Sequence, residues 1–514
     1  MSTFSGLETA RRGMVTQQNA LYTTGHNISN ANTEGYTRQR VNFTATSPFP
    51  NPSINQPKIA GQMGTGVEAG SVQRVRESFL DVQYRSESSK IGYWDSRATG
   101  LDKMEQIMNE PSESGLAKTM DRFWQSLQDL AVNPEDAGAR SVVRQRGLAV
   151  SETFQYLSNS LTAVQKDLGN EINVSVKSIN SIASQISQIN KQISEVEPNG
   201  YLPNDLYDER DRLLDSLSSF GEIKIENVKS GGNALAIAEG MVNVSFVDKN
   251  GQSISLVNGS EAKILSVTPT EAGTGVPTGP ITGVTVGGVN LDLKDSGKLK
   301  GLINSYGYEE AGQVKGVFPD MLDQLDQIAY SFATQFNAVH TQGYTLASST
   351  SPSEQGKLFF ADLGANYKGA ATKIGLSTDV ENLNNIAAST SVNQAGNGQN
   401  ALNLAEVKNT NFSSVTPPAG KTFPITAGTI QAFYESMIGK MGVDSQEATR
   451  LKDNSKVLRD SVETNRQSVS GVSIDEEMTN MVKFQHAYNA SARNLTVIDE
   501  MLDTIINRMG LVGR

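Results

Sequence analysis

The sequence predicts a mainly α-helical protein with β-rich inserts. In the expected architecture the two terminal helices form a coiled coil, long helices form a central bundle, and one or two β-rich domains face outward. Three observations lead to this prediction. Apolar residues recur every seven positions at both ends of the chain, helical periodicity extends without a break over residues 151–196, and residues 222–300 change to a period of two.

The N-terminal segment, residues 4–28, is expected to form an amphipathic helix. Its apolar stripe consists of Leu7, Met14, Leu21 and Ile28. Ser5 and Glu8 have the spacing of a capping box at the helix start, and Gly35 supplies a turn after its end. Because one narrow stripe cannot bury itself, this helix needs a partner.

The C-terminal segment, residues 474–509, is expected to form a second helix with the same design. Its seven-residue stripe consists of Met481, Tyr488, Leu495, Leu502 and Met509. Ser473 and Glu476 again have capping-box spacing, and Asp475 and Glu477 complement the positive end of the helix. Helix capping therefore accounts for these three acidic residues. The stripes of both terminal helices are the predicted assembly interface.

The middle of the chain contains further predicted helices and a β-rich segment. Helical spacing covers residues 101–108, 116–130, 151–196 and 317–339, and another helix is expected to begin near residue 429. Val242, Val244 and Phe246 alternate as in a strand, and Asn250-Gly251 is a strong hairpin turn. Residues 347–428 have weak periodicity and are expected to be β-rich or irregular.

These patterns divide the chain into four expected domains. Residues 1–70 and 472–514 form a terminal coiled-coil assembly domain. Residues 71–219, 298–346 and 429–471 form a helical bundle. Residues 220–297 form a β-rich domain, and residues 347–428 form a second small insert.

Composition narrows the classes of partner and compartment. With 55 acidic and 44 basic residues, the 514-residue chain has a net charge of −11, which argues against nucleic acid as a partner. Two basic clusters, Arg74/Arg76 and Arg140/Arg144/Arg146, are expected on solvated helix faces. The sequence contains no cysteine, no apolar run long enough to insert into a membrane, and no signal-peptide pattern. A cytoplasmic protein and a protein exported unfolded both fit.

No arrangement of residues indicates catalysis. The three histidines, His26, His340 and His486, lack partners at metal-ligand spacing. His340 ends a predicted helix, where a capping or surface role is expected. We therefore expect no catalytic, cofactor-binding or metal-binding residues.

The segment from residue 26 to 40, HNISNANTEGYTRQR, resembles the N-terminal signature of the flagellar axial proteins, a family of rod, hook and hook-associated proteins. The matching residues include Asn27, Asn30, Asn32, Gly35, Tyr36 and Arg38. Glu34 stands where many family members have proline. The C-terminal motif is similar to that of the hook-associated members, and its residues include Gly471, Asp475, Glu476, Glu477 and Gln485. Residues 204–214 and 336–360 add interior matches.

The resemblance implies a non-enzymatic structural component of the bacterial flagellum that joins the hook to the filament. It implies type III export without a cleaved signal peptide, an extracellular location, and self-assembly through the terminal helices. Because each apolar stripe would be buried only by neighbouring subunits, we expect the termini to be mobile in the free monomer. Implied partners are other copies of the chain, the hook protein, the next hook-associated junction protein, and an export chaperone on the C-terminal helix. The alternatives are another axial protein, such as a hook or distal rod subunit, and a cytoplasmic coiled-coil adapter.

Overall fold

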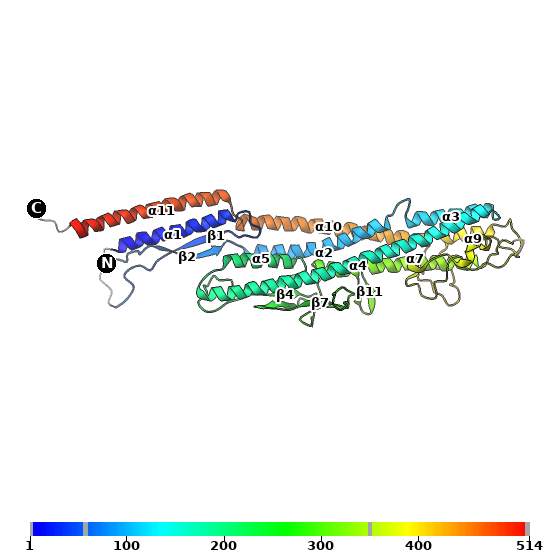
Figure 1. Ribbon diagram of the computed structural model, residues 1–514, viewed down its shortest axis with the longest axis horizontal. Helices are drawn as coiled ribbons and strands as arrows, with labels where there is room; N and C mark the ends of the chain where they lie inside the picture. The colour runs from blue at the N-terminus through cyan, green and yellow to red at the C-terminus, as the bar shows by residue number, and fades with distance from the viewer. Residues whose placement is uncertain (1–3, 55–59, 348–351, 509–514) are drawn as a thin grey trace. The chain divides into compact units, whose positions relative to one another are not determined.

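Long helices make up most of the computed structural model, which describes residues 4–54, 60–347 and 352–508 (Figure 1). The main helices are α1 (Ser5–Ser29), α2 (Ser78–Met108), α3 (Leu116–Val132), α4 (Ala137–Val196), α5 (Asn204–Ser218), α6 (Lys298–Tyr306), α7 (Val317–His340), α10 (Ile430–Ser470) and α11 (Ile474–Asp503). A π-helical turn, Thr504–Arg508, follows α11. Each helix predicted from periodicity is present, and the mainly α fold class with β inserts is confirmed.

Helix α4 begins at Ala137, well before the predicted start at residue 151. The apolar pattern of this first part is interrupted by Gly138, Gly147 and three arginines. Because of these interruptions, the periodicity did not indicate a helix here. Gly147 has a packing reason, because a Cβ at this position would lie only 2.8 Å from Cε1 of Phe359. The helix keeps a glycine where an aromatic ring presses against its backbone.

The chain divides into two compact units. Unit 1 contains Met1–Ser89, Ile179–Ile264 and Ser455–Arg514, and unit 2 contains Lys90–Ser178 and Leu265–Asn454. Three of the four boundaries between them fall inside α2, α4 and α10, and the fourth lies between residues 264 and 265, outside any helix. The division into four domains stays a prediction.

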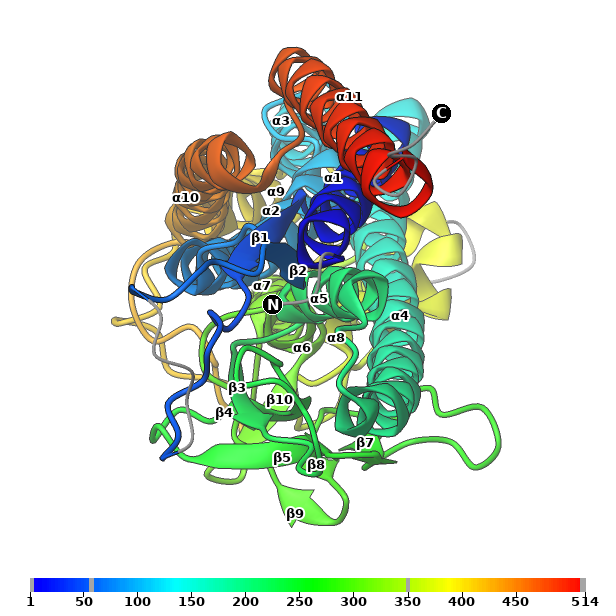
Figure 2. The same cartoon turned by 90° about the vertical axis from the view of Figure 1, so that its left-hand side faces the viewer.

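In unit 1, the terminal helices α1 and α11 pack side by side, as both views show (Figures 1 and 2). Helix α1 also rests on an antiparallel hairpin of β1 (Gln39–Ala45) and β2 (Val67–Arg74). A four-stranded antiparallel sheet follows, with strands β3 (Ile223–Val228), β4 (Met241–Val247), β5 (Ser253–Asn258) and β6 (Glu261–Ala262). The predicted Asn250-Gly251 turn is confirmed between β4 and β5, where Gly251 has a φ of 80°.

Unit 2 has an aromatic core built by α3, α7 and the segment after α7. The ring centroid of Phe123 lies 5.3 Å from that of Phe336 and 5.9 Å from that of Phe359. Strands β7 (Leu265–Thr268), β8 (Gly283–Val286) and β9 (Val289–Asn290) form a second small sheet, and β10 (Tyr308–Glu310) pairs with β11 (Gln313–Lys315).

The segment 347–428 is irregular where it is described. It contains the short helices α8 (Ala370–Lys373) and α9 (Gln399–Ala405) with 3-10 turns, and its described residues form no named strand. The segment covers the end of α7 and buries His340 completely, so the expected surface role of this histidine is wrong. Its Nδ1 lies 2.5 Å from the Lys357 carbonyl and its Nε2 accepts a bond of 3.0 Å from the Ala387 amide. Burial lowers the pKa of His340 to about 4.

Candidate functional site

The candidate site is in unit 1, where the two terminal helices meet. Small residues of α1 allow the close approach of α11. A Cβ at Gly6 would lie 3.3 Å from Cδ1 of Ile498, and a Cβ at Gly13 would lie 3.3 Å from Oγ of Ser491. Larger side chains at these glycines would push the helices apart.

The predicted apolar stripes are only partly covered by this pairing. Seven of the nine residues are half-buried, namely Leu7, Met14, Leu21, Ile28, Met481, Tyr488 and Leu495. Leu502 is buried, and Met509 lies outside the described residues. Their role in contacts between copies of the chain stays a prediction.

The most buried face of α1 is a different one, which the apolar pattern did not reveal. It contains Thr16, Ala20, Thr24 and Asn27 at spacings of three or four, and it packs on the β1–β2 hairpin. The hydroxyl of Thr16 donates to the Val67 carbonyl at 3.1 Å. Since three of the four residues are polar, only their helical spacing could have revealed this face.

Asn27 is the centre of the contact between the two terminal motifs. Its side-chain nitrogen donates to the Gln39 carbonyl at 2.8 Å and to the Glu477 carboxylate at 3.1 Å. Its side-chain oxygen accepts from the Gln39 amide at 3.0 Å and from the Tyr36 hydroxyl at 2.8 Å. An alanine here would leave several buried polar groups without partners.

Arg38 completes this contact through charge. Its Nε donates to Glu477 at 2.8 Å, and its two terminal nitrogens donate to the Glu476 carboxylate at 2.7 and 3.0 Å. Its backbone amide donates to the Ser470 carbonyl at 2.9 Å. Although burial opposes the charge of Arg38, the two glutamates raise its pKa above the ordinary value. We call Asn27, Tyr36, Arg38, Glu476 and Glu477 the terminal clasp.

The clasp corrects the interpretation of the acidic residues as helix caps. Ser473 is the N-cap of α11 but its side chain makes no capping bond, and Glu476 and Glu477 bind Arg38 instead. At the other end of the chain, Ser5 makes no capping-box bond either, and Glu8 binds Arg11 and Arg12.

The other motif residues shape the turns beside the clasp or lie exposed. Gly35 has a φ of 79° and packs on Arg212, and Asn30 donates to the His26 carbonyl at 3.1 Å. A Cβ at Gly471 would lie 2.5 Å from the Gln467 carbonyl, so only glycine fits between α10 and α11. Three further motif residues are exposed and lie outside the clasp, namely Asn32, Asp475 and Gln485.

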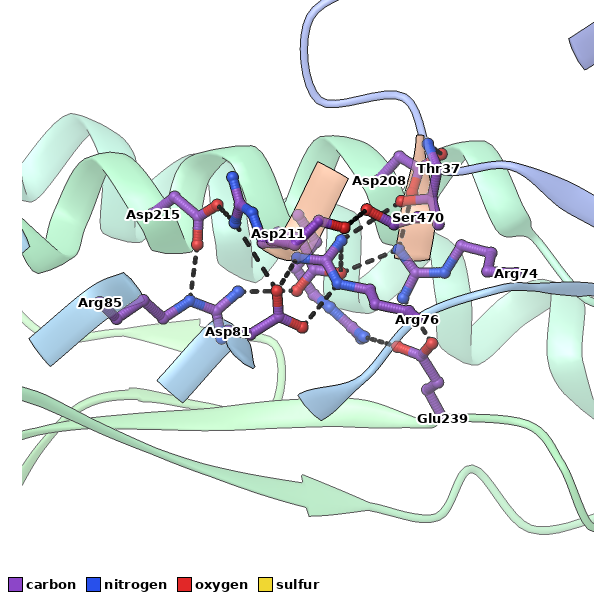
Figure 3. Close-up of polar contacts among 12 residues, drawn as sticks. Thr37, Arg74, Arg76, Asp81, Arg85, Asp208, Asp211, Asp215, Glu239 and Ser470 are labelled. Atoms are coloured by element: carbon purple, nitrogen blue, oxygen red, sulfur yellow. Dashed lines mark hydrogen bonds and ion pairs between the residues drawn. The ribbon is translucent and has the colours of Figure 1, made fainter. Parts of the chain in front are cut away.

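The same unit contains a buried ion-pair network (Figure 3). It lies next to the clasp, because the amide of Thr37, which precedes Arg38, donates to Asp208 at 3.0 Å. Arg74 binds Asp208 at 2.7 Å, Asp211 at 2.8 Å and Glu239. Arg76 contacts Asp81 and Asp211, Arg85 contacts Asp211 and Asp215, and Arg466 of α10 binds Asp215 at 2.6 Å. The network joins three distant segments of the chain, near residues 74–85, 208–239 and 466.

Asp211 is the central acid of this network. Burial would raise its pKa, but Arg76, Arg74 and Arg85 hold the pKa far below its ordinary value. The expectation that Arg74 and Arg76 lie on a solvated helix face is wrong, since their side chains are 4% and 14% exposed. Asp208 and Asp211 lie in the segment 204–214, which was identified by its resemblance to the family. The sequence did not indicate that arginines bind them.

Three family profiles match the chain. The helical domain described as flagellar hook-associated protein FlgK matches residues 101–360. The C-terminal profile of flagellar basal body rod FlgEFG proteins matches residues 464–509, and that of flagella basal body rod proteins matches residues 7–37. The C-terminal profile includes Glu476 and Glu477 of the clasp, and the N-terminal profile includes Asn27 and Tyr36 but ends one residue before Arg38. In the described part of the chain, no helix combines the length and apolarity needed to cross a bilayer.

Relatives of known name are similar over the whole length. Flagellar hook-associated protein 1 of Bacillus subtilis (strain 168) is 45% identical over 520 residues, which covers 100% of both chains. The protein of that name from Escherichia coli (strain K12) is 25% identical over 582 residues, covering 98% of this chain and 99% of the relative. The solved structure of the flagellar hook junction protein FlgK from Burkholderia pseudomallei has a similar fold, with a TM-score of 0.55 and 15% identity over 76% of this chain and 100% of that one. The chain therefore belongs to the flagellar hook-associated protein 1 (FlgK) family.

Proposed function

We propose that this chain is a structural subunit of the junction between hook and filament, where it assembles through its terminal helices. Similarity over the full length to hook-associated protein 1 supports the place in the flagellum. The single observation that supports the mode of assembly is the pair of terminal helices α1 and α11, held together by the clasp but still exposing apolar side chains.

The exposed apolar residues of the N-terminal helix lie on one face, and those of the C-terminal helix form two groups on different sides of the helix. At the N-terminal end they are Phe4, the N-cap of α1, and Val15 and Tyr22 of α1, at spacings of 11 and 7. On α11 and the π-helical turn after it, two groups at spacings of four are exposed, namely Ile474, Met478 and Val482, and Val497, Met501 and Ile505, and Ile506 is exposed next to the second group. Such spacings return to the same side of a helix. Burying one such side chain contributes roughly 1.5–3 kcal/mol, so neighbouring subunits that cover these groups would stabilise an assembly.

The contacts between copies are expected to be heterologous, because contacts of this kind propagate along a helical lattice. The hook protein and the next hook-associated junction protein are the proposed neighbours at the two ends of the zone. Before assembly, the chain is proposed to leave the cell unfolded by type III export without a cleaved signal peptide, with an export chaperone on the C-terminal helix.

The absence of cysteine from the sequence permits a direct test. Three single-cysteine variants are compared: Val15→Cys on α1, Met501→Cys on α11, and Asn250→Cys at the exposed hairpin turn of the β insert. Maleimide labelling should modify all three in the free protein. In isolated hook–filament particles, the first two should be protected while Asn250→Cys remains reactive. Equal labelling of all three variants in the particles would contradict assembly through the terminal helices.

The place in the flagellum is tested separately. A strain that lacks the chain is expected to form hooks without filaments and to release filament subunits into the medium, and immunogold labelling of the restored protein should mark the distal end of the hook. Normal filaments in the deletion strain, or a protein retained in the cytoplasm, would argue for the adapter alternative instead.

A further inference from the structure

Arg140, in the first turn of α4 in unit 2, is a buried arginine without an acidic partner among the described residues. Its side chain was expected on a solvated helix face, yet the residue is 1% exposed. Its Nε donates to the Pro134 carbonyl at 2.7 Å, and its Nη1 donates to the carbonyls of Leu383 at 3.0 Å and Ile386 at 2.8 Å, with Asn384 at 3.5 Å. Its other terminal nitrogen, Nη2, has no acceptor in the described part of the chain.

The nearby acids in sequence do not neutralise this charge. Asp136 is exposed and caps α4 by accepting bonds from the amides of Gly138 and Ala139. Glu135 is exposed as well. Burial is the sole cause that acts on the pKa of Arg140, which it lowers to about 10, so the guanidinium is still protonated at neutral pH. A buried charge that is held only by carbonyl dipoles retains a strong preference for a negative partner.

Arg140 lines a small pocket with a volume of about 70 Å³. The other lining residues are uncharged, and they include Tyr344, Ser389, Asn393 and Gln394. The amide side chains of Asn393 and Gln394 can donate hydrogen bonds without adding negative charge. The volume corresponds to about two water molecules, so one chloride or formate ion fits.

We propose that this pocket binds one small monovalent anion of the size of chloride or formate, with Arg140 as its charged ligand. The anion would provide the negative charge that the described chain does not supply. It would also connect the start of α4 with the segments near residues 344–347 and 389–397, which form the pocket wall. Bound anion would therefore stabilise the packing of this irregular segment on the helices of unit 2.

The test uses the full-length protein with sodium chloride, sodium formate or sodium gluconate at equal ionic strength. Gluconate is too large for the pocket and serves as the control anion. For chloride and formate, the unfolding midpoint should rise saturably by about 2–4 °C once the anion exceeds its dissociation constant several-fold. Gluconate should give no such rise. An equal response to all three salts would refute the proposal.

Two variants on α4 assign the response to a residue. Arg140→Met removes the buried charge while keeping a long side chain, and Arg146→Met removes an exposed charge from the same helix. The chloride response should disappear in the first variant and persist in the second. Its persistence in a folded Arg140→Met variant would overturn the assignment. If that variant does not fold, crystals of the wild-type protein soaked in bromide test the site instead. The proposal requires an anomalous peak beside Nη2, and the absence of such a peak would reject the site.

Discussion

Replacement of Glu477 by alanine tests the terminal clasp most directly. The Glu477 side chain is 3% exposed and accepts from Arg38 Nε at 2.8 Å and from Asn27 at 3.1 Å. Both donors keep other partners, because Arg38 still binds Glu476 and Asn27 still binds the Gln39 carbonyl. We therefore expect Glu477→Ala to lower the free energy of opening of the clasp by about 2–3 kcal/mol. This is less than the cost of leaving a buried charge without any partner.

The matched control is Glu476→Ala. The Glu476 side chain is 56% exposed, and an ion pair in that setting contributes less than about 1 kcal/mol. Each variant removes one carboxylate that binds Arg38, and the two carboxylates belong to adjacent residues in the same turn of the helix. The two carboxylates differ in their burial and in the hydrogen bond from Asn27, which only Glu477 accepts.

Hydrogen exchange of the purified protein provides the measurement. The backbone amides of Arg38 and Gln39 report on the clasp, since they donate to the Ser470 carbonyl and to the Asn27 side chain. A loss of 2–3 kcal/mol in the free energy of local opening should speed their exchange about 30- to 150-fold in Glu477→Ala. In Glu476→Ala the change should stay below about fivefold. Equal rates in the two variants, or wild-type rates in Glu477→Ala, would refute the reasoning.

Three further predictions concern the network, the buried histidine and the C-terminal stripe. Asp211→Asn should destabilise unit 1 by about 3–5 kcal/mol near neutral pH, because arginines around it lose their shared acid. Since the folded pKa of Asp211 lies far below the unfolded value of about 3.9, denaturant titrations should show this difference constant above about pH 5 and shrinking below about pH 4. His340→Gln should flatten the pH dependence of the free energy of unfolding between about pH 6.5 and 4. In this range the wild type loses up to about 3 kcal/mol of stability, because histidine binds a proton in the unfolded chain but stays neutral when buried. An unchanged slope in the variant would contradict this explanation. Leu495→Asp should prevent incorporation into flagella, measured by immunoblot of isolated particles, whereas the exposed neighbour variant Thr496→Asp should be incorporated.

Periodicity in the sequence was enough to locate the helices, because a repeated apolar spacing reports directly on which side of a helix is covered. The start of α11 at Ile474 and the end of α4 at Val196 agree with the prediction. The start of α4 at Ala137 was missed, because there glycine and arginine serve contacts with residues more than 200 positions away, such as Phe359 and Ile386.

The clasp was only half predictable. The motif residues were identified through their resemblance to a family, but nothing in a local pattern indicates that Arg38 binds Glu477, 439 positions later in the chain. The helix-capping interpretation of Glu476 and Glu477 was a sufficient local explanation, and it concealed their tertiary role. Arg74 was misplaced for the same reason, since its partners Asp208 and Asp211 follow 134 and 137 positions later.

The sequence separation across the clasp has a consequence for the order of folding. Closing a flexible loop of that length has an entropic penalty of about 5 kcal/mol, more than the buried bonds of the clasp can supply alone. Folding of the intervening segments shortens the effective loop, so the chain ends can meet only after much of the body has formed. We therefore expect the clasp to be among the last contacts to form and among the first to open, so that the two chain ends separate while the core stays folded.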